Sequence, residues 1–200
     1  MDGVPELPVD LVRPLYGGEA AHDFDHALRV LTTAERIARA EGADVGIVRA
    51  AALLHDIGRE QERREGGDHA LIGAARAREL LADWPSPAVD AVCHAIACHR
   101  FRVQRPPSTV EARVVHDADK LDAIGAIGVA RAFAYGGAHG RRLWAEDGSG
   151  EHTSRQEFRV KLVRIRERLL TDEARRIAGE RHSFMVQFFD RMGDEVLGRA

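Results

Sequence analysis

The spacing of apolar residues constrains the fold of this chain more than any other feature. Apolar side chains recur every three or four positions along most of its 200 residues, and the alternation typical of strands is almost absent. The segments with this spacing are separated by Gly or Pro and cover 24–41, 45–57, 68–83, 87–99, 109–122 and 124–135. The sequence therefore predicts an all-α fold built as a helical bundle.

The last third of the chain predicts two further helices that meet near Thr171 and Asp172. Before them, between 135 and 153, the periodicity fails in a stretch that holds five Gly and Trp144. A loop of this length is typical of a lid or of a disordered segment, and the sequence leaves both open. We expect residues 1–200 to form a single domain, with the helices from about 153 to 200 packing on its core.

Composition and charge limit the classes of partner. With 44% hydrophobic residues and no apolar stretch near the roughly 20 residues of a membrane span, we expect no membrane contact. Two Cys give no disulfide framework, which suits a cytoplasmic protein. A net charge of −3 argues against a nucleic-acid surface and favours a small phosphorylated substrate. The sequence does not distinguish a monomer from a homodimer.

The dipeptide His55-Asp56 marks the candidate active site. It ends the apolar run 50–54, so an imidazole and a carboxylate leave a buried helix together. Burying both costs several kcal/mol unless a partner compensates, and a divalent cation suits both. A second copy of the dipeptide stands at His116-Asp117, where we expect a supporting or surface role for the histidine.

Further candidate ligands stand on both sides of His55-Asp56. His22 and His26 are four residues apart, which places their rings on one face of a helix. Asp119 and Asp122 are three residues apart on a later helix. Two histidines and two carboxylates from separate helices would leave coordination positions for water and substrate, as a hydrolytic metal site requires.

Four segments together resemble the HD-domain metal-dependent phosphohydrolases, in particular small stand-alone bacterial members that include nucleotide pyrophosphohydrolases. The segments are HDFDHALRV at 22–30, AALLHDIGR at 51–59, DHALIGA at 68–74 and DADKLDAIGAIGVAR at 117–131. The resemblance runs from about residue 20 to the C-terminus and implies the all-helical HD bundle. Some members use a Glu three residues after the HD aspartate, but Arg59 stands there and Glu60 follows.

The resemblance also implies roles for single residues. His26, His55, Asp56 and Asp119 would bind the metal ion. Asp56, Lys120 and Asp122 are the candidate catalytic residues. Lys120 would neutralise phosphate charge, and Asp122 or a pocket histidine would orient water or protonate the leaving oxygen. His22 and Asp23 occupy matching motif positions and are candidate substrate contacts.

Three more histidines, His69, His94 and His99, are candidates for binding substrate phosphate or a second metal ion. His94 and His99 are separated by about 140° around a helix, so both face one site only if the helix ends between them. The adjacent Cys93 and Cys98 lack the paired spacing of a zinc site and predict buried apolar side chains.

These features predict a metal-dependent phosphohydrolase that acts on a phosphoester or phosphoanhydride, with a nucleoside triphosphate pyrophosphohydrolase as the leading form. We favour Mn as the cofactor, and Mg, Ni, Co, Fe or Zn also suit the ligand types. A phosphodiesterase or guanosine tetraphosphate hydrolase is the alternative among hydrolases. A di-iron oxygenase and a non-catalytic nucleotide sensor are the alternatives outside that class.

Overall fold

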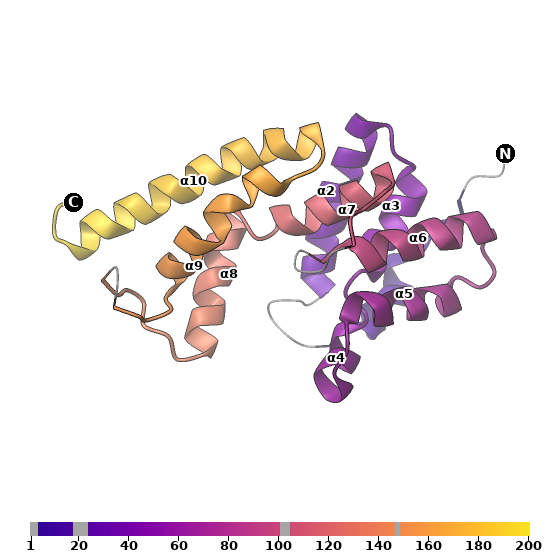
Figure 1. Ribbon diagram of the computed structural model, residues 1–200, viewed down its shortest axis with the longest axis horizontal. Coiled ribbons are helices and arrows are strands. Elements are labelled where there is room, and N and C mark those ends of the chain that lie inside the picture. The colour runs from indigo at the N-terminus through magenta and orange to yellow at the C-terminus, as the bar shows by residue number, and fades with distance from the viewer. Residues whose placement is uncertain (1–3, 18–23, 101–104, 147–148) are drawn as a thin grey trace. The chain divides into compact units, whose positions relative to one another are not determined.

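A computed structural model describes residues 4–17, 24–100, 105–146 and 149–200 of the chain. The chain divides into two compact units, one made of Met1–Asp119 with Leu170–Glu173 and the other of Lys120–Leu169 with Ala174–Ala200. Helices form both units, and the described residues contain no strand (Figure 1). The prediction of an all-α fold is confirmed, whereas the single-domain organisation stays a prediction.

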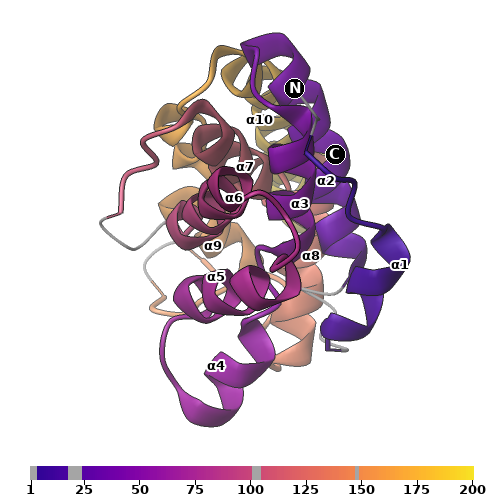
Figure 2. The ribbon, with the colours of Figure 1, turned by 90° about the vertical axis from the view of Figure 1, so that its right-hand side faces the viewer.

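The first unit contains the predicted helices and, among its described residues, two short helices that were not predicted, one near the N-terminus and one after His55-Asp56. Its elements are α1 (Val9–Val12), the 3-10 turn η1 (Arg13–Leu15), α2 (Phe24–Glu41), α3 (Val45–Leu54), α4 (Arg59–Glu65), α5 (His69–Leu80), α6 (Ser86–Cys98) and most of α7 (Val110–Leu121). Helix α3 packs against α2 and α6, and α5 packs along α6 (Figure 2). The short α4 escapes sequence analysis because its seven residues, REQERRE, contain no apolar side chain.

Helix ends in this unit place the functional side chains. Asp68 accepts a hydrogen bond from the Ala70 amide and thereby caps α5 directly before His69. Helix α3 ends at Leu54, so His55 is the first residue beyond it and Asp56 lies in the following turn. Leu53 and Leu54 are completely buried, and they hold this helix end in the core.

The second unit contains α8 (Gly125–Ala138), α9 (Ser154–Val160), the 3-10 turns η2 (Leu162–Arg164) and η3 (Arg166–Arg168), and α10 (Asp172–Val196) from Ala174 onward. Phe158 stacks on Phe189 with ring centroids 4.5 Å apart, which joins α9 to α10. The first predicted C-terminal helix is interrupted at Lys161. Leu162 and Ile165, three residues apart, stay on one buried side because 3-10 turns repeat every three residues.

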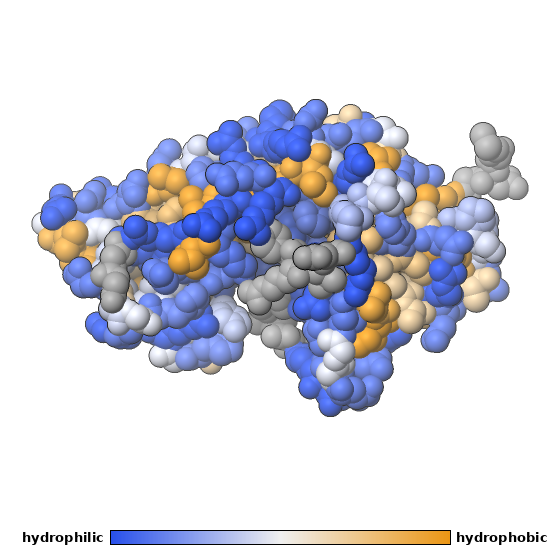
Figure 3. All heavy atoms as spheres, viewed as in Figure 1, coloured by the Kyte–Doolittle hydropathy of each residue, from blue (hydrophilic) through white to orange (hydrophobic). Residues whose placement is uncertain are grey.

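The surface of the described residues is mostly hydrophilic on the face drawn in Figure 3, with apolar side chains in separate patches. Among these residues no helix combines the length and hydropathy that crossing a membrane would require. The predicted irregular stretch 135–153 is helical as far as Ala138, and its described part from His139 to Thr153 forms no helix. A lid role for it stays a prediction.

Candidate metal centre

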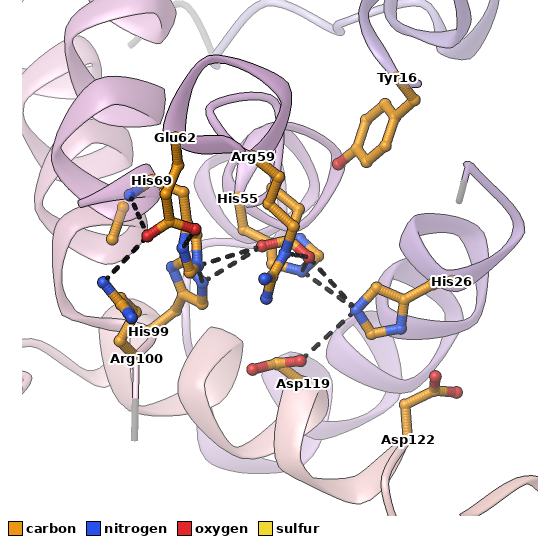
Figure 4. Close-up of polar contacts among 12 residues, drawn as sticks. Tyr16, His26, His55, Arg59, Glu62, His69, His99, Arg100, Asp119 and Asp122 are labelled. Atoms are coloured by element: carbon orange, nitrogen blue, oxygen red, sulfur yellow. Dashed lines mark hydrogen bonds and ion pairs between the residues drawn. The ribbon is translucent and has the colours of Figure 1, made fainter. Parts of the chain in front are cut away.

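Four buried histidines form a continuous row in the first unit. The rings run in the order His26, His55, His99 and His69, and neighbouring centroids are 5.1 to 5.2 Å apart. They come from α2, the turn after α3, the residue after α6 and the start of α5. Each is at most 3% exposed. Figure 4 shows His69 and His99 at one end of the row and His26 at the other.

Hydrogen bonds fix which ring nitrogen of three histidines faces the row. His55 Nδ1 lies 2.8 Å from the Ala52 carbonyl oxygen, and His99 Nδ1 lies 2.7 Å from that of Ile96. His69 Nδ1 lies 2.8 Å from a carboxylate oxygen of Glu62. Since these partners only accept, Nδ1 carries the proton in each ring. The Nε2 atom of each neutral ring therefore presents a lone pair.

These lone pairs face other acceptors. Nε2 of His69 and Nε2 of His99 are 3.3 Å apart, and both lie 3.5 Å from Oδ1 of Asp56. No proton is available to join two such nitrogens in their neutral forms. A cation between them removes the repulsion, and ligand atoms about 2.1 Å from one ion lie about 3.0 to 3.5 Å from each other.

A second group has the same geometry. His26 Nε2 lies 3.3 Å from His55 Nε2 and 3.5 Å from Oδ1 of Asp119. Oδ2 of Asp56 is 3.5 Å from His55 Nε2 and 3.8 Å from His26 Nε2. We name the first set the His69 group (His69, His99 and Asp56) and the second the His26 group (His26, His55 and Asp119). The Asp56 carboxylate faces both groups. Each could hold a metal ion.

Burial keeps the His55 and His69 imidazoles neutral, which is the form that binds metals. Desolvation lowers the pKa of His55 from 6.5 to about 3, even though the Asp56 carboxylate opposes the shift. Desolvation also lowers the pKa of His69, to about 4, helped by the neighbouring Arg59. Both rings are therefore unprotonated at neutral pH, and a cation meets no competing proton there.

Three residues near the centre were not assigned a role from the sequence. Arg59 Nε lies 2.6 Å from Asp56 Oδ2, and although burial alone would lower the pKa of Arg59, that carboxylate raises it. Glu62 contacts His69, as described above. Tyr16 donates to the carbonyl of Leu53, two residues before His55, at 2.8 Å. No periodic or motif signal marks Tyr16 or Glu62, whose role depends on the unpredicted α4.

Other predicted site residues lie elsewhere or beyond the described residues. His22 and Asp23 fall outside the described residues. Lys120 and Asp122 belong to the second unit, where Asp122 pairs with Arg131. His94 belongs to neither group and accepts hydrogen bonds from the amide and hydroxyl of Ser108. Helix α6 ends at Cys98, and only His99 of that pair joins the row, as a member of the His69 group.

The second HD dipeptide and the two cysteines have structural surroundings. Asp117 is completely buried and accepts hydrogen bonds from the Leu170 and Thr171 amides and from the Thr171 hydroxyl. Its neighbour His116 donates to it from Nδ1 at 2.9 Å. Cys93 and Cys98 are free thiols, 7% and 5% exposed, and confirm the prediction of buried side chains.

Comparison with known proteins gives one family and several close relatives. The HD domain model matches residues 23–124. The YpgQ protein of Bacillus subtilis is 35% identical over 185 residues, which cover 90% of this chain and 86% of YpgQ. Ribonuclease Y of Chloroflexus aurantiacus is 42% identical over 98 residues, which cover 49% of this chain and 18% of that protein.

Several solved structures have a fold similar to that of this chain over almost its whole length. Bacillus subtilis YpgQ in complex with ADP is 32% identical, with a TM-score of 0.77 over 96% of this chain and 100% of that one. An HD-superfamily hydrolase from Bacillus thuringiensis is also 32% identical, with a TM-score of 0.77 over 94% of this chain and 93% of that one.

Proposed function

Because the chain belongs to the HD domain family, we propose that it is a metal-dependent phosphohydrolase that cleaves a phosphoester or phosphoanhydride bond of a nucleotide. The observation that carries this proposal is the set of facing acceptors in the row. Three Nε2 lone pairs and the Asp56 carboxylate converge at distances of 3.3 to 3.5 Å. Divalent cations would compensate this arrangement, and nitrogen and oxygen ligands together suit Mn and the other metals predicted from the sequence.

Two ions fit the residues. His26, His55, Asp56 and Asp119 would hold the first, as the family resemblance implies. Asp56 would also contact the second, together with His69 and His99. When bound, such ions lower the pKa of water and neutralise charge on a phosphate. Asp56 is the ligand common to both positions, so its removal should affect both.

Residues of this chain would supply the remaining interactions with substrate. Arg59 lies beside Asp56 and is 26% exposed in its side chain, so its guanidinium is available to a phosphate at the edge of the centre. The roles of Lys120 and Asp122 stay predictions: Lys120 would neutralise phosphate charge, and Asp122 or a pocket histidine would orient water or protonate the leaving oxygen. The ADP bound to YpgQ supports a nucleotide as the substrate class. A terminal pyrophosphate or phosphate is then the predicted leaving product.

The test uses metal-stripped protein reconstituted with Mn and a panel of nucleoside tri-, di- and monophosphates and cyclic dinucleotides. Released phosphate, pyrophosphate and nucleotides are measured. We expect turnover that is lost in Asp56→Ala and retained in Asp90→Ala, whose carboxylate lies on α6 and is 65% exposed. The identity of the products shows which phosphoester or phosphoanhydride bond is cleaved.

The remaining alternatives give different outcomes. A fully metallated, folded protein that binds nucleotide without turnover would favour the sensor. Iron in the purified protein together with oxygen uptake would favour the oxygenase. Either result would refute the hydrolase.

A further inference from the structure

The His69 group is held together by an ion-pair network outside the centre. Both carboxylate oxygens of Glu62, on α4, accept hydrogen bonds from His69. Oε1 accepts from the backbone N–H of His69 at 3.2 Å, and Oε2 accepts from ring Nδ1 at 2.8 Å (Figure 4). Glu62 thereby fixes both the start of α5 and the direction in which the His69 ring points.

This support differs from that of the two other oriented histidines. His55 and His99 each donate to the carbonyl of the residue three positions earlier, within their own helix end. Their ring orientation follows from the local backbone. The orientation of His69 depends on a side chain from another helix, so a single substitution can remove it without changing a metal ligand.

Two arginines hold the acidic partners in place. Arg100, directly after His99, lies 3.4 Å from Glu62 Oε1 and 2.8 Å from Asp68 Oδ1. Arg105 lies 3.0 Å from the other Asp68 oxygen. Asp68 also caps α5. Glu62 contacts His69, and Arg100, which directly follows His99 in the chain, contacts Glu62, so the network lies beside both histidines of this group.

We propose that Glu62 is a positioning residue that sets the affinity of the His69 group for a second divalent cation. The His26 group binds its ion without Glu62. This inference rests on the proposed function, because it needs a protein that binds metal. It predicts that substitution of one α4 carboxylate separates the two binding events.

The test variant is Glu62→Gln, which keeps the size of the side chain. An amide has one acceptor oxygen, whereas Glu62 accepts from two N–H groups, so one of the two bonds to His69 must be lost. The matched control is Glu65→Gln on the same helix, where the carboxylate is 58% exposed and bonds to Gln61. Glu62→Ala removes both bonds and gives the larger effect.

Metal content and affinity are measured without reference to activity. Mn is titrated into metal-stripped protein by calorimetry, and bound ions are counted by elemental analysis after gel filtration. We expect two ions in the wild type and in Glu65→Gln. In Glu62→Gln the second ion should bind about 10 to 100 times more weakly while the first binds unchanged. Retention of the first ion also reports that the variant is folded.

Three results would overturn the inference. Two ions bound with wild-type affinities in both Glu62 variants would show that Glu62 does not set the site. Equal weakening of both ions would assign Glu62 a general structural role. If the wild type binds one ion, the second metal position does not exist and the inference fails. If the wild type binds no ion at all, the proposed function itself is refuted.

Discussion

Gly58 is the last residue of the turn 55–58, which contains His55 and Asp56, and it lies where this turn approaches the backbone of α5. A Cβ atom built on Gly58 would be 2.3 Å from the carbonyl oxygen of His69 and 2.7 Å from the amide nitrogen of Gly73. Since real Cβ contacts essentially never fall below 3.0 Å, Gly58→Ala must separate the turn from α5 by about 0.7 Å. Neither atom belongs to a side chain that could rotate away.

The cost of this substitution follows from its geometry. Gly58 has φ −82° and ψ −9°, which alanine adopts readily, so the penalty comes from packing and not from backbone strain. Overpacking a close contact costs about 1 to 3 kcal/mol, and two backbone neighbours favour the upper end, about 3 kcal/mol. The shift also exceeds the roughly 0.5 Å tolerance of a metal site, so the second ion should bind more weakly.

Gly73→Ala is the matched control on the facing helix. Its Cβ would meet the His55 carbonyl oxygen and a methyl group of Ile96 at 3.4 Å, which is ordinary contact. Alanine in a helix interior is more favourable than glycine by about 1 kcal/mol. Urea unfolding should therefore show Gly58→Ala less stable than Gly73→Ala by roughly 4 kcal/mol. Equal unfolding midpoints in the two variants would refute this account of the turn.

Two further predictions concern the titration of the histidines and the second HD dipeptide. In metal-free protein the pKa values of His55 and His69, about 3 and about 4, lie below the ordinary histidine value of 6.5. As the pH falls, these histidines therefore take up protons in the unfolded chain before they do so in the folded protein. Stability should be constant above pH 6.5 and fall by on the order of 2 kcal/mol per histidine by pH 5; equal urea midpoints at pH 7.5 and pH 5 would contradict this. Asp117→Ala should lower the free energy of unfolding by about 3 kcal/mol or more, because the buried amides of Leu170 and Thr171 lose their acceptor. Asp90→Ala, an exposed carboxylate, should change urea unfolding by less than about 0.5 kcal/mol, and a similar loss in both variants would show that Asp117 has no special role.

The fold was predictable wherever helices carry an apolar face. Helix α2, described from Phe24 onward, ends where its apolar spacing ends, at Glu41. Helix α8 continues three residues beyond the predicted end at Tyr135, through two Gly and Ala138. Helix α4 was missed because it is charged on every side and is fixed by contacts with α5. Apolar residues recur periodically in a helix because one of its faces is buried. A helix held by ion pairs has no such apolar face, so the sequence shows no periodic pattern for it.

The candidate centre was predictable in its residue types and not in its grouping. Spacing alone kept both His94 and His99 as candidates and did not identify His99 as the one that joins a group. The end of α6 at Cys98 separates them, because His99 can donate Nδ1 to Ile96 while turning Nε2 toward Asp56. His94 remains inside the helix and faces Ser108. A shift of one helix end therefore decides which histidine joins the His69 group, and helix ends are what sequence patterns locate least well.

The two HD dipeptides show how surroundings decide the use of one motif. Asp117 faces three N–H and O–H donors from Leu170 and Thr171, which satisfy its charge without a metal ion. Asp56 faces three histidines whose Nε2 atoms carry lone pairs, so these nitrogens cannot serve as donors to it. Its nearby cation is Arg59, at one oxygen. The same dipeptide thus anchors a chain segment in one place and faces both candidate metal positions in the other. N–H and O–H donors of Leu170 and Thr171 bind Asp117, whereas the groups near Asp56 include three imidazole Nε2 atoms as well as Arg59.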